Sequence, residues 1–373
     1  MKVLHLISGG DTGGAKAHII SLVKELDKLI DAKVICFIED TFYYEALDAG
    51  INIEVFEQKK RSDMSVVNRL KEEIDREGYD VIHCHGARAN FIGFFLKSKI
   101  NKPMITTIHS DYKLDFKDNF YKKIVYTGLN SIALKKFDYY IAISNTFKEM
   151  LVKRGFKENK IFTVYNGIDL EGKMNYISRE EFFKRYNIEA KDKIIVGIAA
   201  RLDLVKDHET FIRAAYKVLK KEKNIIFLIA GTGNDEKRLK ALTEELGIGD
   251  SVHFLGYVKD PYSFFNAIDI NVLTSVSESF PYVILEGARL KKTIISTDVG
   301  GVSQLVENGK NGWLIEVGDS DALAEKIVFF INNKDRINEM GENLFKSVEA
   351  NFSSKRMAEE HIKIYKKILE NWR

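Results

Sequence analysis

The chain has 373 residues, of which 45% are hydrophobic and 30% are charged, with a formal net charge of +3. This composition is typical of a folded globular protein and excludes disordered and fibrous chains. The length suits two α/β domains of about 150–200 residues each. No apolar run approaches the roughly 18 residues needed to span a bilayer, and the first strand-like run lacks the basic segment and cleavage site of a signal peptide. We therefore expect a cytoplasmic protein.

Two cysteines, Cys36 and Cys84, both lie inside apolar strand-like runs. We expect them to be buried free thiols in a reducing compartment. His83 and His85 flank Cys84, and the two-residue period of a strand would place both imidazoles on one face. Such a pair more often has a structural role than binds metal, and no Cys or His set in the sequence has the spacing of metal ligands. We expect neither a metal nor a cofactor.

The first half of the chain alternates short apolar runs with amphipathic segments. The apolar runs predict strands, and Ile19, Leu22 and Leu26 form a helical stripe between the first two of them. Buried strands that alternate with helices indicate a parallel sheet covered on both faces. The expected strands are 3–7, 33–38, 81–84, 104–108, 139–143 and 161–164.

After residue 169 the pattern loosens into a polar stretch, 170–192, which we interpret as a linker. A second series of strands follows at 194–199, 225–230, 252–255, 270–273 and 293–296. A final helix is expected at 354–373, where apolar residues from Met357 to Trp372 recur every three or four positions. This order predicts two α/β domains in tandem, at 1–169 and 193–353, with a ligand site in the cleft between them.

The strongest functional motif begins at Glu278 and ends at Glu286, after the strand at 270–273. Pro281 suits the first position of a helix, because it has no N–H to leave unpaired there. The helix N-terminus would then offer backbone N–H groups to a diphosphate. A carboxylate accepts two hydrogen bonds at once, which suits the vicinal hydroxyls of a sugar or ribose. The alternative is an ordinary surface-loop glutamate and an ordinary helical one.

Arg201 and Lys206 follow the strand at 194–199, at the edge where α/β sheets bind ligands. A guanidinium can fork onto a phosphate, and a lysine adds a point charge. In a site without metal, such cations offset the charge on a leaving nucleoside diphosphate. The alternative is an ion pair with Asp203 or Asp207 in the same loop.

Three further motifs are less specific. Glycine-rich segments at 9–14 and 231–233 follow strands and let the backbone approach a ligand, but neither has the G-x-G-x-x-G spacing of nicotinamide-dinucleotide binding. His109 follows the strand at 104–108, where it is either a group that positions a reacting sugar or an ordinary structural histidine. The only Asp-x-Asp, from Asp319 to Asp321, is typical of a helix N-cap and not of a metal site.

Residues 97–160 carry 14 Lys or Arg against 6 Asp or Glu, a local charge of +8. Four lysines stand among aromatic residues in this segment: Lys122, Lys123, Lys135 and Lys136. The segment is either a solvated surface or an attachment to an anionic membrane. Nucleic-acid binding is not expected, because no nucleic-acid-binding motif accompanies the charge.

Taken together, these motifs resemble family 4 of the glycosyltransferases over nearly the whole chain. The resemblance rests on the stretches 13–18, 107–109, 164–169, 254–258, 278–286 and 298–301, and on Arg201 and Lys206 at the family's spacing. It implies the α/β GT-B fold of two facing Rossmann-like domains, with an acceptor-binding first domain, a nucleotide-sugar-binding second domain and a last helix that crosses back onto the first. It also implies a retaining, metal-independent transfer in which the donor phosphate takes the acceptor's proton.

The resemblance also implies roles for individual residues of this sequence. The implied catalytic residues are His109, Arg201, Lys206 and Glu278, with Glu278 at the transferred sugar. The implied donor-nucleotide contacts are Gly13, Gly14, Gly231, Gly256, Tyr257, Val258, Phe280, Pro281, Tyr282, Val283 and Glu286, with Glu286 at the ribose. The implied acceptor contacts are His18, His85 and Arg88.

The sequence departs from the family pattern at four positions. Ala200 precedes the arginine and Asp207 follows the lysine where glycine is usual, and Lys291 and Thr293 replace a usual glycine and proline. These changes put the shape of local turns in doubt, but not the chemistry.

The resemblance implies transfer of a hexose or N-acetylhexosamine from a UDP- or GDP-linked donor to a glycan or lipid-linked acceptor, in the synthesis of an envelope polysaccharide or glycolipid. If the basic segment binds lipid, the protein is peripheral on the inner face of the cell membrane. One alternative is a nucleotide-sugar epimerase of the same fold, which the set of two cations and two glutamates disfavours. The other is a non-catalytic sugar- or membrane-binding subunit, which the intact site disfavours.

Overall fold

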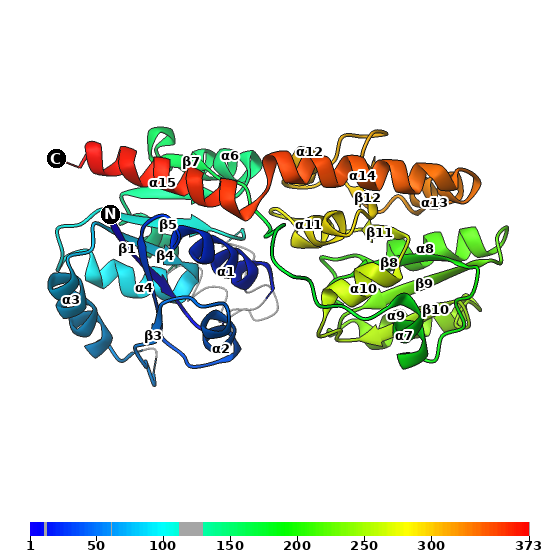
Figure 1. Ribbon diagram of the computed structural model, residues 1–373, viewed down its shortest axis with the longest axis horizontal. Coiled ribbons are helices and arrows are strands. Elements are labelled where there is room, and N and C mark those ends of the chain that lie inside the picture. Colours follow the sequence, from blue (N-terminus) through cyan, green and yellow to red (C-terminus); the bar gives the residue numbers. More distant parts are fainter. Residues whose placement is uncertain (11–12, 61, 112–129, 373) are drawn as a thin grey trace. The chain divides into compact units, whose positions relative to one another are not determined.

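The computed structural model describes residues 1–10, 13–60, 62–111 and 130–372. The chain divides into two compact units, each built on its own parallel sheet (Figure 1). The first unit comprises Met1–Asp169 and Phe352–Arg373, and the second comprises Leu170–Asn351.

The sheet of the first unit is wholly parallel. Its strands are β1 (Lys2–Ile7), β2 (Asp31–Cys36), β3 (Ile53–Val55), β4 (Val81–His85), β5 (Met104–Ile108), β6 (Tyr139–Ala142) and β7 (Ile161–Thr163). Within the described residues the seven strands follow the order β3-β2-β1-β4-β5-β6-β7. Strands β4 and β5 are buried along their whole length, as expected for a parallel sheet that is covered on both faces.

Helices cover both faces of this sheet. They are α1 (Gly14–Leu26), α2 (Thr41–Asp48), α3 (Ser65–Glu77), α4 (Gly86–Leu96), α6 (Asn145–Lys153) and α15 (Ser354–Glu370). One apolar core lies between the sheet and α3, α4 and α6, and the other lies between the sheet and α1, α2 and α15. Helix α15 lies along α1 (Figure 1), and the Ser354 N–H donates to the Ile168 carbonyl at 2.9 Å. The last helix is therefore part of the first unit.

The second unit repeats the same design. Its strands are β8 (Ile194–Ala199), β9 (Ile225–Ala230), β10 (Val252–Gly256), β11 (Ile270–Leu273), β12 (Thr293–Thr297) and β13 (Trp313–Ile315). In the described part of this unit they form a parallel sheet in the order β10-β9-β8-β11-β12-β13. Its helices are α7 (Arg179–Arg185), α8 (His208–Leu219), α9 (Glu236–Glu245), α10 (Pro261–Ala267), α11 (Tyr282–Arg289), α12 (Val302–Leu305), α13 (Ser320–Asn332) and α14 (Lys334–Asn351). Helices α8, α9 and α13 share one core with the sheet, and α7 and α10 share the other.

All the strands expected from the sequence are present, with ends shifted by at most two residues, and β3 and β13 are additional. Residues 170–192 differ from the expected linker, because they contain α7. Phe182 and Phe183 of that helix are buried in the core of the second unit. Cys36 and Cys84 are buried free thiols, as expected. Across the residues described, no helix combines the length and the apolar character needed to cross a membrane.

Each sheet has one place where the strand order reverses. In the first unit it lies between β1 and β4, and in the second it lies between β8 and β11. Open α/β sheets bind their ligands outside the carboxyl ends of the strands at such a point. The loops that follow β8 and β11 carry Arg201, Lys206 and Glu278.

Candidate active site

Lys206 and Glu278 meet at the switch point of the second unit. Lys206 lies in the loop after β8, and Glu278 lies in the loop after β11. Lys206 Nζ lies 2.5 Å from Glu278 Oε1, and the Ser275 hydroxyl donates to the same oxygen at 2.6 Å. The lysine side chain is 20% exposed and the glutamate side chain 9%. The ammonium therefore has N–H groups left for an anion, and the second carboxylate oxygen can accept from a ligand.

Arg201 lies at the start of the loop after β8. Its Nη2 lies 3.0 Å from Asp203 Oδ2, and its side chain is 80% exposed. An ion pair this exposed contributes at most about 1 kcal/mol, so the guanidinium can leave Asp203 for a phosphate at little cost. Of the two ion pairs that the sequence offered as alternatives, the one with Asp203 is formed, whereas Asp207 caps α8.

Helix α11 places Glu286 beside this loop system. The helix begins one residue later than expected, because Pro281 is its N-cap and not its first helical residue. Glu286 lies in the second turn and is half-buried. Burial raises the pKa of Glu286 to about 7, since desolvation disfavours the charged carboxylate. Both protonation states are therefore populated at neutral pH, as is common for carboxyl groups in functional sites.

Two glycines allow the neighbouring loops to touch. A Cβ at Gly231 would lie 1.9 Å from the Ala200 carbonyl oxygen, and one at Gly300 would lie 1.7 Å from the Glu278 carbonyl oxygen. Both glycines also have positive φ, at 142° and 57°, which other residues rarely adopt. These approaches join the loops after β8 and β9 and the loops after β11 and β12. Together with the bond between Lys206 and Glu278, they join all four loops into one packed set.

The remaining residues expected at the nucleotide lie around these loops or in the first unit. Tyr257 is 74% exposed and can present its ring to a base, whereas the Phe280 side chain is 2% exposed and can only support the loop from beneath. Gly256 ends β10, Val258 and Val283 are half-buried, and Tyr282 is a buried first residue of α11. In the first unit, Gly13 is the N-cap of α1 with φ of 63°, and Gly14 is its first residue.

Two of the departures from the family pattern keep the backbone shape that glycine would give. Asp207 has φ of 45° and Lys291 has φ of 56°, both in the left-handed region. Asp207 also stabilises the start of α8, since its carboxylate accepts from the Thr210 N–H at 3.3 Å and from its hydroxyl at 2.6 Å. The turns are therefore preserved at both positions.

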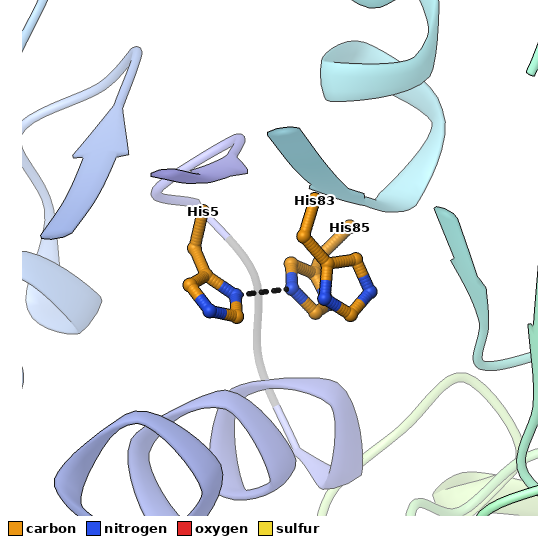
Figure 2. A group of neighbouring side chains, drawn as sticks. All are labelled: His5, His83 and His85. Atoms are coloured by element: carbon orange, nitrogen blue, oxygen red, sulfur yellow. Dashed lines mark hydrogen bonds between the residues drawn. The ribbon is translucent and has the colours of Figure 1, made fainter. Parts of the chain in front are cut away.

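A cluster of histidines lies in the first unit. Its members are His5, His18, His83, His85, His109 and His361, six of the eight histidines in the chain. His5 on β1 pairs in register with His83 on β4, and its ring points toward that of His85 (Figure 2). His5 Nδ1 lies 3.0 Å from His85 Nε2, and His85 Nδ1 lies 3.3 Å from His109 Nε2. A continuous chain of imidazoles thus leads from β1 to His109.

Other elements fix the rings of the cluster. His18 on α1 has its Nδ1 2.9 Å from Asn166 Oδ1. His83 lies between the Tyr365 hydroxyl at 2.6 Å and the Thr107 hydroxyl at 2.8 Å. Because Tyr365 belongs to α15, the last helix of the chain helps to hold the central strand β4.

Burial keeps these imidazoles neutral. It lowers the pKa of His109 to about 4 and that of His5 to about 3, with a further contribution from His361. The pKa values of His18 and His85 are lowered well below the ordinary value, again mainly by burial and then by neighbouring histidines. A neutral imidazole has one N–H and one lone pair, so at pH 7 the cluster can hold hydrogen bonds or ligands but carries no charge.

Two of the three residues expected at the acceptor lie close to His109. His18 and His85 lie in the cluster with His109, with the His18 and His109 ring centroids 4.7 Å apart. Arg88 lies on α4 and is half-buried. Asp319 accepts from two backbone N–H groups at the start of α13, which confirms its expected role as an N-cap.

Of the basic segment, Lys135 and Lys136 are exposed, while Lys122 and Lys123 lie outside the described residues. In the described part of this segment, Ile132 is also 59% exposed.

Sequence reasoning missed three of the residues that shape these sites, namely Ser275, His5 and Tyr365. Ser275 contacts Glu278 within one loop, whereas the contacts of His5 with His85 and of Tyr365 with His83 depend on strand order and helix packing. It also missed two groups of three histidines in which one nitrogen of each ring lies within 4.8 Å of one nitrogen of each of the other two: His5, His83 and His85, and His18, His85 and His109. Each group combines residues from at least two elements, so local spacing indicates at most the pair His83 and His85 on β4.

The chain matches two family models. Residues 12–171 match the model described as Glycosyltransferase Family 4, and residues 178–347 match the one described as Glycosyl transferases group 1. The match over 178–347 includes β8 and β11, the two strands at the switch point of the second unit.

Named relatives agree with these matches. N-acetyl-alpha-D-glucosaminyl L-malate synthase of Bacillus anthracis is 27% identical over 315 residues, which are 83% of this chain and 80% of that protein. UDP-Gal:alpha-D-GlcNAc-diphosphoundecaprenol alpha-1,3-galactosyltransferase of Escherichia coli is 26% identical over 280 residues, 73% of this chain and 71% of that one. The structures of Anabaena HepE with UDP and with UDP-glucose have a TM-score of 0.82 at 22% identity and cover 98% of this chain and 100% of theirs. This chain is therefore a glycosyltransferase of family 4, with the GT-B fold of two Rossmann-like domains.

Proposed function

We propose that the protein is a retaining, metal-independent glycosyltransferase that moves a hexose or N-acetylhexosamine from a UDP- or GDP-linked donor to a glycan or lipid-linked acceptor. The observation that carries this proposal is the contact between Lys206 and Glu278 at the switch point of the second unit. A cation for the diphosphate and a carboxylate for the sugar are held there side by side. The second unit then binds the donor, and the first binds the acceptor.

Two cations serve the leaving diphosphate. Lys206 is held by Glu278 and keeps N–H groups free, and Arg201 is paired only at the surface. Fixed donors aimed at charge that develops in the transition state are worth far more than mobile ones, because they need no reorganisation during the reaction. This positive charge takes the place of a metal ion. The one Asp-x-Asp of the chain is used to cap α13.

The two glutamates contact different parts of the donor. Glu278 has one oxygen occupied by Lys206 and Ser275, so its other oxygen accepts from a hydroxyl of the transferred sugar. Glu286, within α11, accepts from the ribose hydroxyls, and Tyr257 faces the base. Contacts at the reacting sugar act on kcat, and contacts at the ribose act on binding.

His109 positions the sugar as a neutral hydrogen-bonding group, since its pKa of about 4 leaves it uncharged at pH 7. With no second carboxylate assigned to the reacting carbon, the donor phosphate takes the proton of the acceptor hydroxyl. The new bond forms on the face that the diphosphate leaves, which gives retention.

The relatives guide the choice of substrates. The Escherichia coli relative is named for a UDP-galactose donor and a diphosphoundecaprenol-linked acceptor, and HepE was solved with UDP and UDP-glucose. They support a uridine nucleotide as the first donor to test and a polysaccharide or glycolipid as the product. Exposed Lys135, Lys136 and Ile132 support peripheral contact with an anionic membrane face.

Release of nucleotide from a panel of UDP- and GDP-sugars tests the proposal directly. The panel contains glucose, galactose, mannose and N-acetylglucosamine donors, and the anomeric configuration of any transfer product is read by NMR. Lys206→Met removes the charge but keeps the apolar stem. The matched control is Lys240→Met, which removes an exposed lysine that pairs with Glu236 on α9.

We expect one donor class to be turned over with retention. Lys206→Met should reduce the rate about 10²–10³-fold, the usual effect of losing one such electrostatic contact, while Lys240→Met stays near wild type. Failure of every donor to bind or react would overturn the proposal. A rate for Lys206→Met within a few-fold of wild type would assign this lysine a structural role only.

A further inference from the structure

Three histidines of the first unit converge on one point in a way that the transfer reaction does not require. His18 on α1, His85 at the end of β4 and His109 after β5 have one nitrogen each within 4.8 Å of the other two. Two of the three are fully buried, whereas His109 is half-buried. A small ion therefore has access from the side of His109.

The hydrogen bonds of His18 leave its free nitrogen suited to a ligand role. Its Nδ1 bonds to the Asn166 side-chain oxygen, which can only accept, so the proton lies on Nδ1. Nε2 then has a lone pair, and it is buried with no hydrogen-bond partner. A histidine whose other nitrogen donates to a fixed oxygen is the usual form of a metal ligand.

His85 and His109 already have the spacing of two ligands. Their facing nitrogens are 3.3 Å apart. The edge of a tetrahedron with Zn–N bonds of about 2.0–2.1 Å is also about 3.3–3.4 Å. If His85 donates from Nε2 to His5 Nδ1, its Nδ1 is free to bind an ion. The displaced proton moves to His5 Nε2, which has no partner, so the change needs no net loss of protons.

The other histidine triad is less suited to an ion. Both nitrogens of His83 are occupied, by Tyr365 and by Thr107. His5 Nδ1 and His85 Nε2 are 3.0 Å apart, which is less than the edge of the tetrahedron, and a hydrogen bond joins them (Figure 2). An ion there would have to break at least one of these bonds of 2.6–3.0 Å, whereas an ion at His18, His85 and His109 replaces only the longer contact of 3.3 Å between His85 and His109.

We propose that His18, His85 and His109 form a binding site for a divalent transition metal such as Zn²⁺ or Co²⁺, with an open fourth position. Three neutral imidazoles without a carboxylate select borderline-soft ions over Mg²⁺, Ca²⁺ and Mn²⁺. A bound ion withdraws His109 from the sugar and so inhibits transfer. This last consequence alone rests on the proposed function.

Cobalt absorption tests the site without any assay of transfer. Tag-free protein is stripped with EDTA, dialysed and titrated with Co²⁺, because tetrahedral Co²⁺ has intense visible bands and a polyhistidine tag would bind the ion itself. The variants are His109→Asn, at the most accessible ligand, and His18→Gln, which keeps an amide for Asn166. His253→Asn, at a half-buried histidine of β10 in the second unit, is the matched control. Circular dichroism and thermal melting check that each variant is folded.

We expect a one-to-one tetrahedral spectrum that Zn²⁺ abolishes and Mg²⁺ does not. Both ligand variants should weaken Co²⁺ binding by at least about 100-fold, since even the loss of an outer-shell partner costs 10–100-fold, and His253→Asn should bind like wild type. No tetrahedral spectrum at several-fold excess Co²⁺, or unchanged binding in folded His109→Asn, would overturn the site. If one variant is unfolded, the other variant and the wild-type titration decide. If Co²⁺ binds at this site but Zn²⁺ leaves donor hydrolysis unaffected, the site stands and the role of His109 in the proposed function is wrong.

Discussion

Replacing Glu286 by glutamine should stabilise the protein and weaken its hold on nucleotide at the same time. Burial raises the pKa of Glu286 from an ordinary 4.5 to about 7. The native state therefore holds a proton between these two values that the unfolded state has lost, so stability falls as pH rises through this window and levels off above it. At about 1.4 kcal/mol for each tenfold change, the full difference is roughly 3 kcal/mol. Because the side chain is half-buried and keeps some water, we expect about 1–2 kcal/mol.

Because glutamine carries no charge, the variant should not lose stability as the pH rises. At pH 5 the two proteins should melt alike, and at pH 8 Glu286→Gln should melt several degrees higher, since 1 kcal/mol shifts the midpoint of a unit this size by about 2–4 °C. Whereas the substitution should raise stability, it should weaken nucleotide binding. A hydrogen bond to a charged group is worth about 1.5–3 kcal/mol, so UDP or GDP should bind about 10–100-fold more weakly.

Scanning calorimetry at pH 5 and pH 8 measures the melting temperatures, and titration calorimetry at pH 6 and pH 8 measures nucleotide affinity. Wild-type affinity for the nucleotide should rise with pH more steeply than that of the variant, because only the wild type gains a carboxylate. Titration of the nucleotide phosphate affects both proteins equally, so the difference between wild type and variant reports on Glu286 alone. Glu325→Gln, at an exposed position of α13, is the matched control and should change neither property. Parallel curves of stability against pH for wild type and Glu286→Gln, or equal nucleotide affinity, would refute the reasoning.

The other predictions concern the loops and the chemistry of the donor site. Glu278→Gln removes the ion pair with Lys206 but keeps the shape of the side chain, so kcat should fall at least about tenfold (1.4 kcal/mol). Nucleotide affinity, measured by calorimetry, should stay nearly unchanged. A loss of nucleotide binding would show that the assigned roles of the two glutamates are reversed. Gly300→Ala should reduce donor hydrolysis at least about tenfold, because its Cβ would meet the Glu278 carbonyl. Gly318→Ala, which also has positive φ (80° against 57°) but open space around its Cβ, should not. Lys291→Gly should be about 1 kcal/mol more stable in thermal unfolding than Lys291→Ala, since only glycine relieves the left-handed backbone; equal stability would contradict this account. Donor hydrolysis should persist in excess EDTA, and a loss restored by Mg²⁺ or Mn²⁺ would rule out the metal-free mechanism.

The sequence was informative about the fold where elements are long and buried. The continuous apolar runs at β8 and β9 predict central strands of a covered sheet, and the structure confirms them. The edge strands β3 and β13 have three residues each and are mostly half-exposed. So short a segment has no measurable period, and its pairing is decided by the neighbouring strand. The helix α7 was hidden for a related reason, since only two of its residues are buried.

For the candidate site, too, the sequence predicts some features and not others. Arg201, Lys206, Glu278 and Glu286 lie in local motifs at the ends of strands, and sequence alone could indicate them. Their contacts could not be read in this way, because Lys206 and Glu278 are 72 residues apart and meet only through the order of strands β8 and β11. The bond between His83 and Tyr365 spans 282 residues. Spacing along the sequence therefore indicates which functional groups are present, and the order of strands in the sheet determines which of these groups come into contact.

The positions that depart from the family pattern show what such a pattern records. Glycine is usual after the lysine and after the α11 helix, and this chain has Asp207 and Lys291 there, yet both keep positive φ. A left-handed residue other than glycine costs about 1–2 kcal/mol. Asp207 offsets this by capping α8 through Thr210, since a cap is worth about 1 kcal/mol. The pattern therefore records a backbone conformation, and any residue that supplies a compensating bond can satisfy it. Gly231 and Gly300 differ, because there a Cβ would collide with a carbonyl oxygen, and no side-chain bond can offset a collision.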